Sequence, residues 1–453
     1  MQIYNSTGGL NRIGTFSAYF RKAGKSKISW QRRSVEPMVF PCVICYTDSV
    51  LKEEKGENPM LVREITPEER RRTTELFGIA FELPVDKEDP REPLPENIHL
   101  WAAFQEEEMA SCMTLVSHPI RFDGHVCRMT GIGGVSTLPQ YRRQGGIRSI
   151  FSEILPHMYQ TGVNFSYLYP FSTAYYRQFG YETCVQKLQV TMKLANLRVP
   201  AGEGHFCLSE QRHPMAEQIR SLDRLWERKF NMMVQHQEPF YDWVTKANPA
   251  VDQEFTYVFF DAADRPKAYL TYHMEHQSTD RNLICTRFCF VDREGFNGLM
   301  RFFQSVSADH DYAQFQLPAS SGMQHLIPEW TLGNPTFTLI PWGMVRVINA
   351  ESVLKKAKYQ GSGCLTLALR DSLIPENNDT FTVRFEKGVA VGVERNTRTA
   401  DISLDIHTFS GLILGTVDFS EAAQWMEGLE IQTPGACFDQ VFYRKQMMIT
   451  DFF

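Results

Sequence analysis

The sequence predicts a mixed α+β fold, and three observations support this class. The 453 residues correspond to about three domains at a typical length of roughly 150 residues each. A hydrophobic fraction of 43% allows several buried cores, which excludes a mainly disordered chain or a collagen-like fibre. Strand-like runs alternate with helical patterns, and the same order of elements occurs twice. We expect an extension followed by three domains, at 1–59, 60–198, 199–345 and 346–453.

The overall charge and the cysteine content exclude several classes of protein. A formal net charge of −6 argues against a dedicated nucleic-acid-binding protein, because such proteins carry a basic surface. Ten cysteines are too few for a disulfide scaffold, and no spacing pairs them. The sequence has no run of about 18 apolar residues that could cross a membrane as a helix. We therefore expect a cytoplasmic protein with neither a nucleic acid nor a membrane as its partner.

The first 59 residues differ from the rest of the chain. They contain nine basic and five acidic residues, a net charge of +4, which leaves −10 for the remainder. A basic, acid-poor N-terminus can resemble a targeting segment, but the apolar stretch at 38–45 contains Pro41 and lacks a small-residue cleavage site. We expect an unstructured tail. The alternative is a true start at Met60, because residues 52–57 can be encoded by purines alone, as a bacterial ribosome-binding site would be.

The domain at 60–198 begins with a helix and three strands. Thr66-Pro67-Glu68-Glu69 is a capping box with proline at the first helical position, which predicts a helix to about Phe81. Three strand-like runs follow, at 98–104, 110–118 and 126–138. A second helix is predicted after a short loop, because apolar residues recur on one helical face: Ile147, Ile150, Phe151, Ile154, Leu155 and Met158.

A short loop rich in glycine and arginine lies between the third strand and that helix, Gln140-Tyr141-Arg142-Arg143-Gln144-Gly145-Gly146-Ile147-Arg148. Glycines let backbone N–H groups approach an anion closely, and the N-terminus of the following helix adds a favourable dipole. Arg142, Arg143 and Arg148 add cations at the same end. The sequence therefore predicts a phosphate cradle that is neither a Walker A loop nor a dinucleotide fingerprint.

Three stretches carry a resemblance to a known family: Val135-Ser136-Thr137, Tyr141-Arg142-Arg143-Gln144-Gly145-Gly146 and Tyr175-Tyr176-Arg177-Gln178-Phe179-Gly180-Tyr181. They resemble the GNAT acetyltransferases, and most closely the Eis (enhanced intracellular survival) family. The GNAT loop pattern, Arg/Gln-x-x-Gly-x-Gly/Ala, is matched from Arg142 except at its last position, Ile147, where Eis-like proteins commonly depart too. The resemblance covers about residues 60–453. It implies tandem GNAT domains, the second degenerate, followed by a sterol-carrier-protein-like domain.

The resemblance also implies that acetyl-CoA is bound and by which residues. Backbone groups of the Val135 strand would pair with the pantetheine arm, and the loop would hold the pyrophosphate. The implied contact set is Val135, Ser136, Thr137, Arg143, Gln144, Gly145, Gly146, Ile147, Arg148, Phe171 and Ser172. Tyr176 would protonate the departing thiolate, which is feasible because a phenol pKa of about 10 lies close to a thiol pKa of about 8.5. Tyr175 is the alternative, and plain packing is the competing role for every tyrosine here.

The domain at 199–345 repeats this order of elements, with helices near 215–230 and 296–306. No Arg-x-x-Gly pattern precedes the second of these helices, so we expect a degenerate copy that does not hold CoA. Its expected roles are to wall the substrate cavity and to form subunit contacts. His273 and His276 have the spacing of a metal pair, but no third ligand is near them in the sequence, so we expect no metal site.

The domain at 346–453 combines a short helix, alternating strands and a second capped helix. The run at 381–386 alternates cleanly and ends in the turn signal Lys387-Gly388, and Asp418 is placed to cap a helix. The pattern resembles the sterol-carrier-protein fold. Taken alone, it would indicate a module for an apolar ligand.

The chain ends in Ile449-Thr450-Asp451-Phe452-Phe453, which is unusually aromatic for a chain end. One interpretation is that the two phenylalanines dock in a groove. The other, implied by the family, is that the α-carboxylate of Phe453 enters the active site as the catalytic base. A carboxylate pKa of about 3.5 is low for that task, so the group would orient the amine, act through water, or have its pKa raised by burial. Asp451 is a rival carboxylate.

Together these features predict an acetyl-CoA-dependent N-acetyltransferase that moves the acetyl group directly to a primary amine. Its catalytic residues would be Tyr176 and Phe453, with no metal. The net charge of −10 on residues 60–453 suits a cationic substrate through electrostatic steering. The resemblance implies an aminoglycoside-like polyamine or a lysine side chain as substrate, and a homo-oligomer such as a hexamer. Two alternatives stay open: a carrier of lipids or other apolar ligands, and a catalytically silent sensor that binds acyl-CoA.

Overall fold

The computed structural model describes residues 60–85, 94–195, 197–236, 238–277, 280–319, 322–327, 331 and 333–451. These residues form two compact units. The first comprises the described chain up to Pro95 together with Leu100–Met113 and Gly134–Ile150. The second comprises Glu96–His99, Thr114–Gly133 and the described chain from Phe151 onward. The predictions for residues 1–59 lie outside the described residues.

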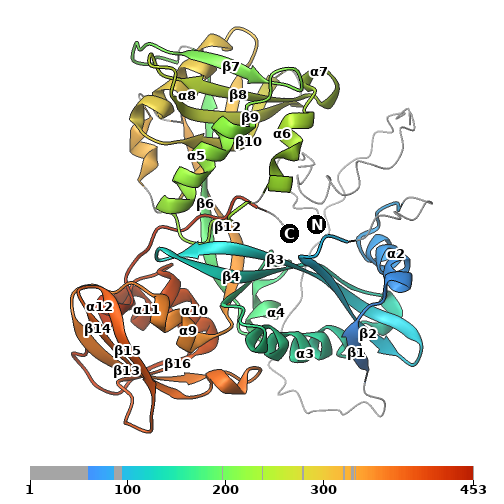
Figure 1. Cartoon of the computed structure of the whole chain (residues 1–453), viewed down its shortest axis with the longest axis vertical. Coiled ribbons are helices and arrows are strands. Elements are labelled where there is room, and N and C mark those ends of the chain that lie inside the picture. Colours follow the sequence, from blue (N-terminus) through green and yellow to red (C-terminus); the bar gives the residue numbers. More distant parts are fainter. Residues whose placement is uncertain are drawn as a thin grey trace. The chain divides into compact units, whose positions relative to one another are not determined.

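The first unit contains a sheet and the helix predicted from the capping box. The elements that lie wholly or partly in it are β1 (Leu61–Glu64), the 3-10 turn η1 (Pro67–Glu69), α2 (Arg70–Phe81), β2 (Ile98–Gln105), β3 (Glu108–Phe122), β4 (His125–Thr137), the 3-10 turn η2 (Pro139–Tyr141) and α3 (Gly146–Gln160). The backbone N–H of Thr66 donates to the Glu69 carboxylate at 2.9 Å, as expected. Helix α2 lies against the sheet (Figure 1). The buried core of this part contains Leu76, Ala102, Phe104, Met109, Cys112 and Leu138.

The second unit contains a sheet whose strands follow the order β3-β4-β5-β12-β6-β11-β10-β9-β8-β7. The strands beyond β4 are β5 (Phe165–Leu168), β6 (Glu182–Lys193), β7 (His205–Ser209), β8 (Glu254–Phe260), β9 (Pro266–Gln277), β10 (Asp280–Phe290), β11 (Tyr312–Pro318) and β12 (Thr336–Val347). Strand β12 lies between β5 and β6 and is antiparallel to both. A strand from late in the chain therefore completes the sheet of the first predicted domain.

The two long helices of this unit lie where the sequence predicts them. The helices are α4 (Thr173–Arg177), α5 (Ala216–Lys229), α6 (Asp242–Lys246), α7 (Pro249–Asp252) and α8 (Arg293–Ser305), with 3-10 turns η3 (Glu238–Tyr241) and η4 (Met323–Leu326). Helices α5 and α8 lie against β9 and β10 and bury an aromatic core that includes Trp226, Phe259, Phe296 and Phe303. No helix in the described part of the chain is long and apolar enough to cross a membrane.

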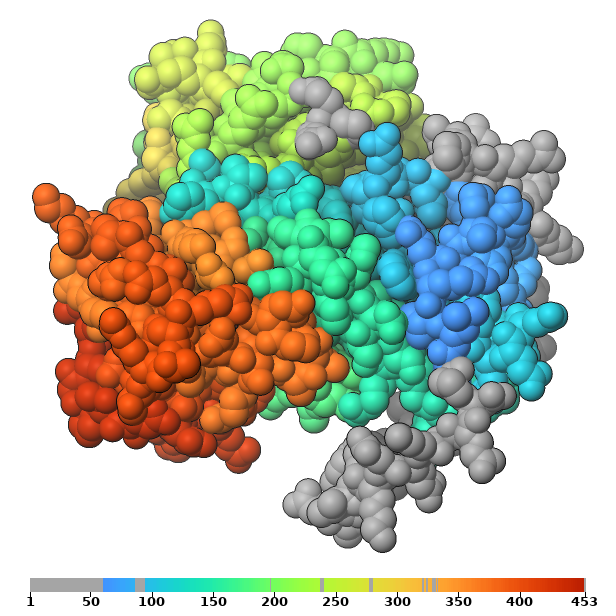
Figure 2. Space-filling model, turned by 60° about the horizontal axis from the view of Figure 1, so that its bottom comes forward, coloured from blue at the N-terminus to red at the C-terminus, as the bar shows by residue number. Residues whose placement is uncertain are grey.

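The chain after β12 forms a second sheet of five strands in the order β15-β14-β13-β16-β17. Its elements are α9 (Ala350–Lys356), β13 (Gly363–Arg370), the 3-10 turn η5 (Pro375–Asn377), β14 (Thr380–Glu386), β15 (Val389–Arg395), β16 (Ile402–Asp405), α10 (Ile406–Leu414), α11 (Phe419–Trp425), β17 (Leu429–Ile431) and α12 (Phe438–Val441). The predicted turn at Lys387-Gly388 has positive φ angles of 49° and 84°. Figure 2 shows this part of the chain, orange to red, as one continuous lobe.

Three segments that are far apart in the sequence lie side by side in the second unit. The segment 231–235 pairs on one side with 119–121 of β3, through backbone hydrogen bonds of 2.7 to 3.2 Å. On its other side it pairs with 446–448, through backbone bonds of 2.9 and 3.0 Å. We call these three segments the three-segment ribbon. It holds 446–448, near the C-terminal end of the described chain, beside a segment that itself pairs with β3.

Candidate active site

The predicted phosphate loop links β4 to α3 in the first unit. Its backbone takes up left-handed conformations at Arg143 (φ 65°) and Gly145 (φ 84°). A Cβ on Gly145 would meet no described atom within 4 Å, whereas a Cβ on Gly146 would lie 2.4 Å from the Ser111 hydroxyl oxygen. Ile147 turns its side chain into the core, so it can offer a ligand only its backbone. The loop is therefore open at one glycine and tightly packed at the next.

Three arginines surround this turn. Arg142, Arg143 and Arg148 are exposed, and neither Arg142 nor Arg143 forms an ion pair with another residue that the structure describes. The Gln144 side chain donates to the carbonyl of Gln140 at 2.9 Å, which leaves the backbone of Gln144 for a ligand. Helix α3 begins here and is 15 residues long, so its first N–H groups and its dipole favour an anion at this end. The geometry fits a pyrophosphate.

The residues of the predicted pantetheine strand lie at the end of β4. Ser136 is buried, and its hydroxyl donates to the carbonyl of Gly134 at 2.9 Å. The hydroxyl oxygen of Thr137 lies 2.9 Å from that of Ser111, and Val135 is partly exposed. Both hydroxyls are used within the protein, so the backbone is the part of this strand that can bind a ligand.

The pairing of strands β4 and β5 stops before the end of β4. Their parallel pairing runs from Met129 opposite Phe165 to Ile132 opposite Leu168, and it ends there. Tyr169 is the first residue beyond this pairing on the β5 side. Backbone groups of β4 beyond Ile132 are not satisfied by β5, so an extended ligand can hydrogen-bond to them.

Tyr176 lies in the short helix α4, which Ser172 caps by accepting a hydrogen bond from the N–H of Tyr175 at 3.3 Å. The Tyr176 side chain is 2% exposed. Its ring is enclosed by other rings at centroid separations of 5.2 to 6.4 Å, those of Phe151, Phe171, Tyr175 and Tyr181. Burial raises the pKa of the Tyr176 phenol well above its usual value, so this group stays protonated at neutral pH.

The Tyr176 hydroxyl differs from those of two nearby tyrosines. The Tyr181 hydroxyl lies 2.7 Å from Ser166 Oγ, and the Tyr169 hydroxyl donates to the backbone carbonyl of Asp451. The Tyr176 hydroxyl makes no hydrogen bond to another residue in the described part of the chain. The Tyr176 hydroxyl can therefore donate a hydrogen bond to a ligand.

The C-terminal segment places Asp451 deep in the second unit, whereas Phe453 lies outside the described residues. Asp451 is 6% exposed. One of its carboxylate oxygens lies 3.0 Å from Nε2 of His236, and the other accepts from the Thr450 hydroxyl at 3.0 Å. With its backbone carbonyl bound by Tyr169, Asp451 is held through both its side chain and its main chain.

Aromatic rings and a guanidinium group line the region around Asp451. The His236 imidazole stacks on Phe240, with ring centroids 3.4 Å apart and planes inclined by 7°. The Arg287 guanidinium lies over the rings of Phe240 and Trp243, at 5.0 and 5.2 Å from their centroids. Burial alone would raise the pKa of the Asp451 carboxyl, but the charge and hydrogen bond of His236, together with the charge of Arg287, hold it well below its usual range. Asp451 is therefore ionised.

Lys187, on β6, lies in the same region. It is 3% exposed, and its Nζ lies 3.6 Å from the centroid of the Trp342 ring. Burial lowers the pKa of Lys187 to about 7, although the charge of Asp451 opposes this shift. Near neutral pH the amine of Lys187 is therefore only partly charged.

The sequence analysis misses His236, Arg287 and Lys187. None of them lies in a motif, and each comes beside Asp451 only through pairing with remote segments. Sequence reasoning singles out Asp451 alone, for its closeness to the chain end. Among the described residues, no group of three or more His, Cys, Asp or Glu side chains could hold a metal ion.

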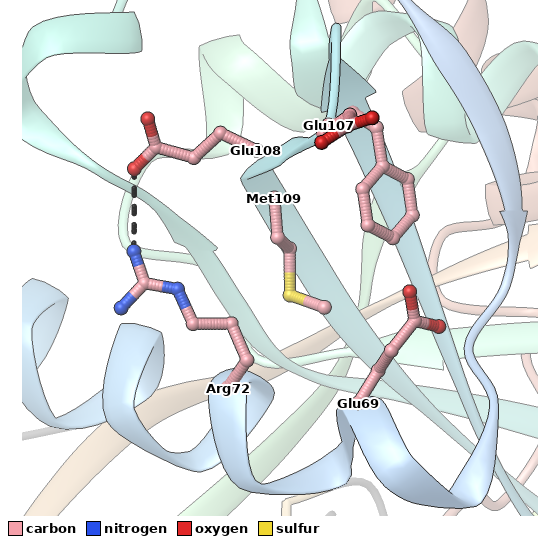
Figure 3. A pocket seen from close by; sticks show the side chains of 6 residues that line it. Glu69, Arg72, Glu107, Glu108 and Met109 are labelled. Carbon is pink, nitrogen blue, oxygen red and sulfur yellow. Dashed lines mark hydrogen bonds and ion pairs between the residues drawn. The ribbon is translucent and has the colours of Figure 1, made fainter.

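A shallow hollow in the first unit lies apart from the predicted residues. Its volume is about 380 Å³, and Figure 3 shows its lining, which consists of Glu69, Arg72, Phe104, Glu107, Glu108 and Met109. Arg72 pairs with Glu108 at 3.3 Å, and Arg63 binds both carboxylate oxygens of Glu69 at 2.6 and 2.7 Å. The lining contains none of the predicted site residues, so this hollow is not the candidate site.

Comparison with known proteins identifies the domains. Residues 61–184 and residues 232–347 each match an acetyltransferase (GNAT) domain, and residues 350–446 match a sterol carrier protein domain. This chain carries two GNAT acetyltransferase domains. The predictions of tandem GNAT domains with a closing sterol carrier protein domain, and of an N-acetyltransferase, are confirmed. The domain boundaries and the site residues stay predictions.

Solved structures share the fold of this GNAT chain. A conserved protein from Enterococcus faecalis is 20% identical with a TM-score of 0.74. A GCN5-related N-acetyltransferase from Anabaena variabilis is 16% identical with a TM-score of 0.73, and Eis1 from Mycobacterium abscessus is 18% identical with a TM-score of 0.70. Each likeness covers 87% of this chain and 100% of the other, and together they support the Eis-like fold. By sequence, no curated protein matches this chain.

Proposed function

We propose that this chain transfers an acetyl group from acetyl-CoA directly to a primary amine. The observation that carries the proposal is Tyr176, a buried, protonated phenol whose hydroxyl is not bound by another described residue. Burial keeps this phenol protonated but also makes it a weaker acid, so it would give up its proton only as the C–S bond breaks and negative charge develops on the sulfur. GNAT acetyltransferases use acetyl-CoA generally, and the loop before α3 fits the pyrophosphate of that molecule.

Backbone groups and cations would hold acetyl-CoA. The N–H groups of residues 143–148 would bind the pyrophosphate, and the exposed guanidinium groups of Arg142 and Arg143 would add positive charge. The backbone of Val135–Thr137 would pair with the pantetheine arm, because the hydroxyls of this strand are already used. Phe171, which is 66% exposed, would supply apolar surface next to Tyr176.

In the proposed reaction the neutral amine attacks the carbonyl carbon of the thioester. The N–C bond forms while the carbonyl electron pair moves to oxygen. When the tetrahedral intermediate collapses, the C–S bond breaks and Tyr176 gives its proton to the sulfur. The nitrogen then loses a proton, which restores the phenol. The base that first deprotonates the ammonium is, by the family resemblance, the α-carboxylate of Phe453.

The proposed substrate is a cationic amine, either an aminoglycoside-like polyamine or a lysine side chain. One feature supports this choice: the net charge of −10 on residues 60–453 attracts cations. We also propose a homo-oligomer to which the second GNAT domain contributes subunit contacts.

Turnover of acetyl-CoA tests the proposed function. Released thiol and the mass of the acetylated product would be measured with aminoglycosides, polyamines and lysine peptides. We expect turnover with at least one class, and a KM for acetyl-CoA raised at least about tenfold by Arg142→Ala/Arg143→Ala, because both phosphate contacts are lost. Arg72→Ala, in the same unit but outside the loop, is the matched control. Binding of acetyl-CoA without turnover would favour the silent sensor.

The sterol carrier protein domain at 350–446 supports a second candidate function, transport of an apolar ligand. Mass spectrometry of lipid extracted from the purified full chain tests it. A stoichiometric lipid would establish ligand carriage beside acetyl transfer. Protein free of lipid that still turns over acetyl-CoA would leave acetyl transfer as the function.

A further inference from the structure

We propose that the sterol carrier protein domain positions the proton donor, by holding the turn that carries Tyr176. We call this turn, residues 176–182, the donor turn. The inference rests on the proposed acetyl transfer and gives the last domain a part in that reaction. Asp371 and His407 of that domain would be positioning residues, because they act through the donor turn. The donor turn and both of these residues belong to the second compact unit.

The donor turn needs support from outside. Helix α4, in which it begins, has only five residues, and so short a helix is not stable by itself in water. The chain then folds back on Tyr176, whose carbonyl accepts from the N–H groups of Phe179 at 3.0 Å and of Tyr181 at 3.3 Å. The position of the Tyr176 side chain therefore depends on what holds the residues that follow it.

A buried arginine joins the donor turn to the sterol carrier protein domain. Arg346, on β12, donates through Nη1 to the backbone carbonyl of Phe179. Its Nη2 donates to both carboxylate oxygens of Asp371 at 2.7 Å, and each of the two charged side chains is 1% exposed. Separating such a pair would leave a buried charge without its partner. Arg346 therefore links the position of Asp371 to that of the donor turn.

Asp371 is in turn fixed within its own domain. One carboxylate oxygen accepts from the backbone N–H groups of Leu373 and Ile374 at 3.0 and 3.1 Å. The other accepts from the side-chain amide of Asn377 at 3.0 Å. All of these residues lie in the stretch that matches the sterol carrier protein domain. The domain thus orients the carboxylate that orients Arg346.

The domain also packs directly against the donor turn. A Cβ on Gly180 would overlap the guanidinium group of Arg346 and would lie 2.8 Å from Cγ2 of Ile406. Ile406 is the first residue of α10. Glycine at position 180 therefore lets both groups approach the backbone of the turn closely.

A second contact holds the far end of the donor turn. Arg177, which directly follows Tyr176, donates to the Glu182 carboxylate at 2.7 and 3.0 Å, so this ion pair closes the turn on itself. Nδ1 of His407, in α10, lies 3.4 Å from the same carboxylate. The Glu182 side chain is 8% exposed, so these contacts are made away from solvent. The donor turn is therefore held at Phe179 and again at Glu182.

Ring stacking carries this hold to the proton donor. Phe179, whose carbonyl Arg346 binds, stacks on Phe151 with ring centroids 4.2 Å apart. Phe151 in turn lies edge-on to the Tyr176 ring at 6.3 Å. A loosened Phe179 would let the Tyr176 ring shift, and a catalytic group misplaced by about 1 Å loses on the order of 100-fold in rate. The hold should therefore affect kcat rather than the binding of acetyl-CoA.

A double-mutant cycle in the full chain tests the proposal. Asp371→Asn keeps the side-chain volume but removes the charge that holds Arg346. We expect it to lower kcat at least about tenfold with an unchanged KM for acetyl-CoA. In the Tyr176→Phe background the same substitution should lower kcat no further, because it acts through the Tyr176 hydroxyl. An equal loss in both backgrounds would overturn the proposal, since Asp371 would then act by another route.

Asp261→Asn is the matched control. Asp261, in the turn between β8 and β9, accepts from Arg265 at 2.8 Å and from two backbone N–H groups at 2.9 and 3.0 Å. Its side chain is 2% exposed, so the same chemical change is made at a similarly bonded aspartate outside the donor turn. We expect Asp261→Asn to keep the kcat of the wild type.

A milder variant covers the case in which Asp371→Asn does not fold, which thermal unfolding reveals. Glu182→Gln keeps the side-chain shape and removes the charge between Arg177 and His407. It then takes the place of Asp371→Asn in the cycle, with the same expectation of a loss in kcat that disappears in the Tyr176→Phe background. A folded Glu182→Gln with the kcat of the wild type would overturn the proposal.

Fluorine NMR separates this inference from the proposed function. In protein labelled with fluorotyrosine, the Tyr176 signal is the one that is missing from Tyr176→Phe. It should shift in Asp371→Asn and stay in place in Asp261→Asn. A Tyr176 signal that does not move in folded Asp371→Asn would overturn this inference alone. Absence of turnover in the wild type would overturn the proposed function together with it.

Discussion

Replacing Gly146 by alanine is expected to damage the phosphate loop. The new Cβ would lie 2.4 Å from the hydroxyl oxygen of Ser111 and 3.1 Å from its Cβ, so the Ser111 hydroxyl must turn away from its partner Thr137 at 2.9 Å or the loop must move. Overpacking of this kind costs about 1–3 kcal/mol. A moved loop also misplaces the N–H groups that would bind pyrophosphate, and each 1.4 kcal/mol lost corresponds to about a tenfold loss of affinity. Calorimetric titration with acetyl-CoA measures the loss of affinity, and thermal unfolding measures the loss of stability.

Two companion variants isolate the steric cause. Gly145→Ala adds a Cβ in open space at a φ of 84°, so it should cost only about 1–2 kcal/mol of backbone strain without disturbing the packing at Gly146. Ser111→Ala removes the oxygen at 2.4 Å and should restore much of the affinity when combined with Gly146→Ala. The reasoning is refuted if Gly146→Ala alone binds acetyl-CoA as tightly as wild type with an unchanged Tm.

Three further predictions concern the second unit. Arg346→Met leaves Asp371 buried without its partner at 2.7 Å and should lower the free energy of unfolding by about 3–5 kcal/mol, measured in urea. Lys187 has its pKa lowered from 10.5 to about 7, so stability should rise as pH increases from about 7 towards 10, and Lys187→Met should abolish that rise. Burial would raise the pKa of Glu182, but hydrogen bonds, first that with His407, lower it from 4.5 to about 2. The stability that Glu182 contributes should therefore be lost as the pH falls from about 4.5 to about 2. Glu182→Gln should make the free energy of unfolding less dependent on pH over that range.

Features that depend on neighbouring residues are predictable from this sequence. The capping box at Thr66 precedes α2, the apolar face of Ile147 and Ile150 belongs to α3, and Lys387-Gly388 forms the turn between β14 and β15. Each is determined by the conformational preferences of a few adjacent residues. The loop before α3 is predictable for the same reason, because its glycines and arginines are adjacent in the sequence and lie in one turn.

Features that depend on remote pairing are not predictable in this way. Strand β12 lies between β5 and β6, although its sequence indicates only an extended segment. The three-segment ribbon likewise joins 119–121, 231–235 and 446–448, and no local periodicity encodes which edges meet. The His236–Asp451 contact follows from that ribbon, which is why sequence reasoning finds Asp451 and misses His236.

The kcat of Tyr176→Phe, compared with that of Tyr175→Phe, tests the central claim most directly. Both variants remove one hydroxyl and keep an aromatic ring, so packing changes little in either. We expect Tyr176→Phe to lower kcat on the order of 100-fold with unchanged binding of acetyl-CoA, and Tyr175→Phe to stay close to wild type. Full activity in Tyr176→Phe would contradict the assignment of the proton donor, and loss confined to Tyr175→Phe would transfer the role to Tyr175.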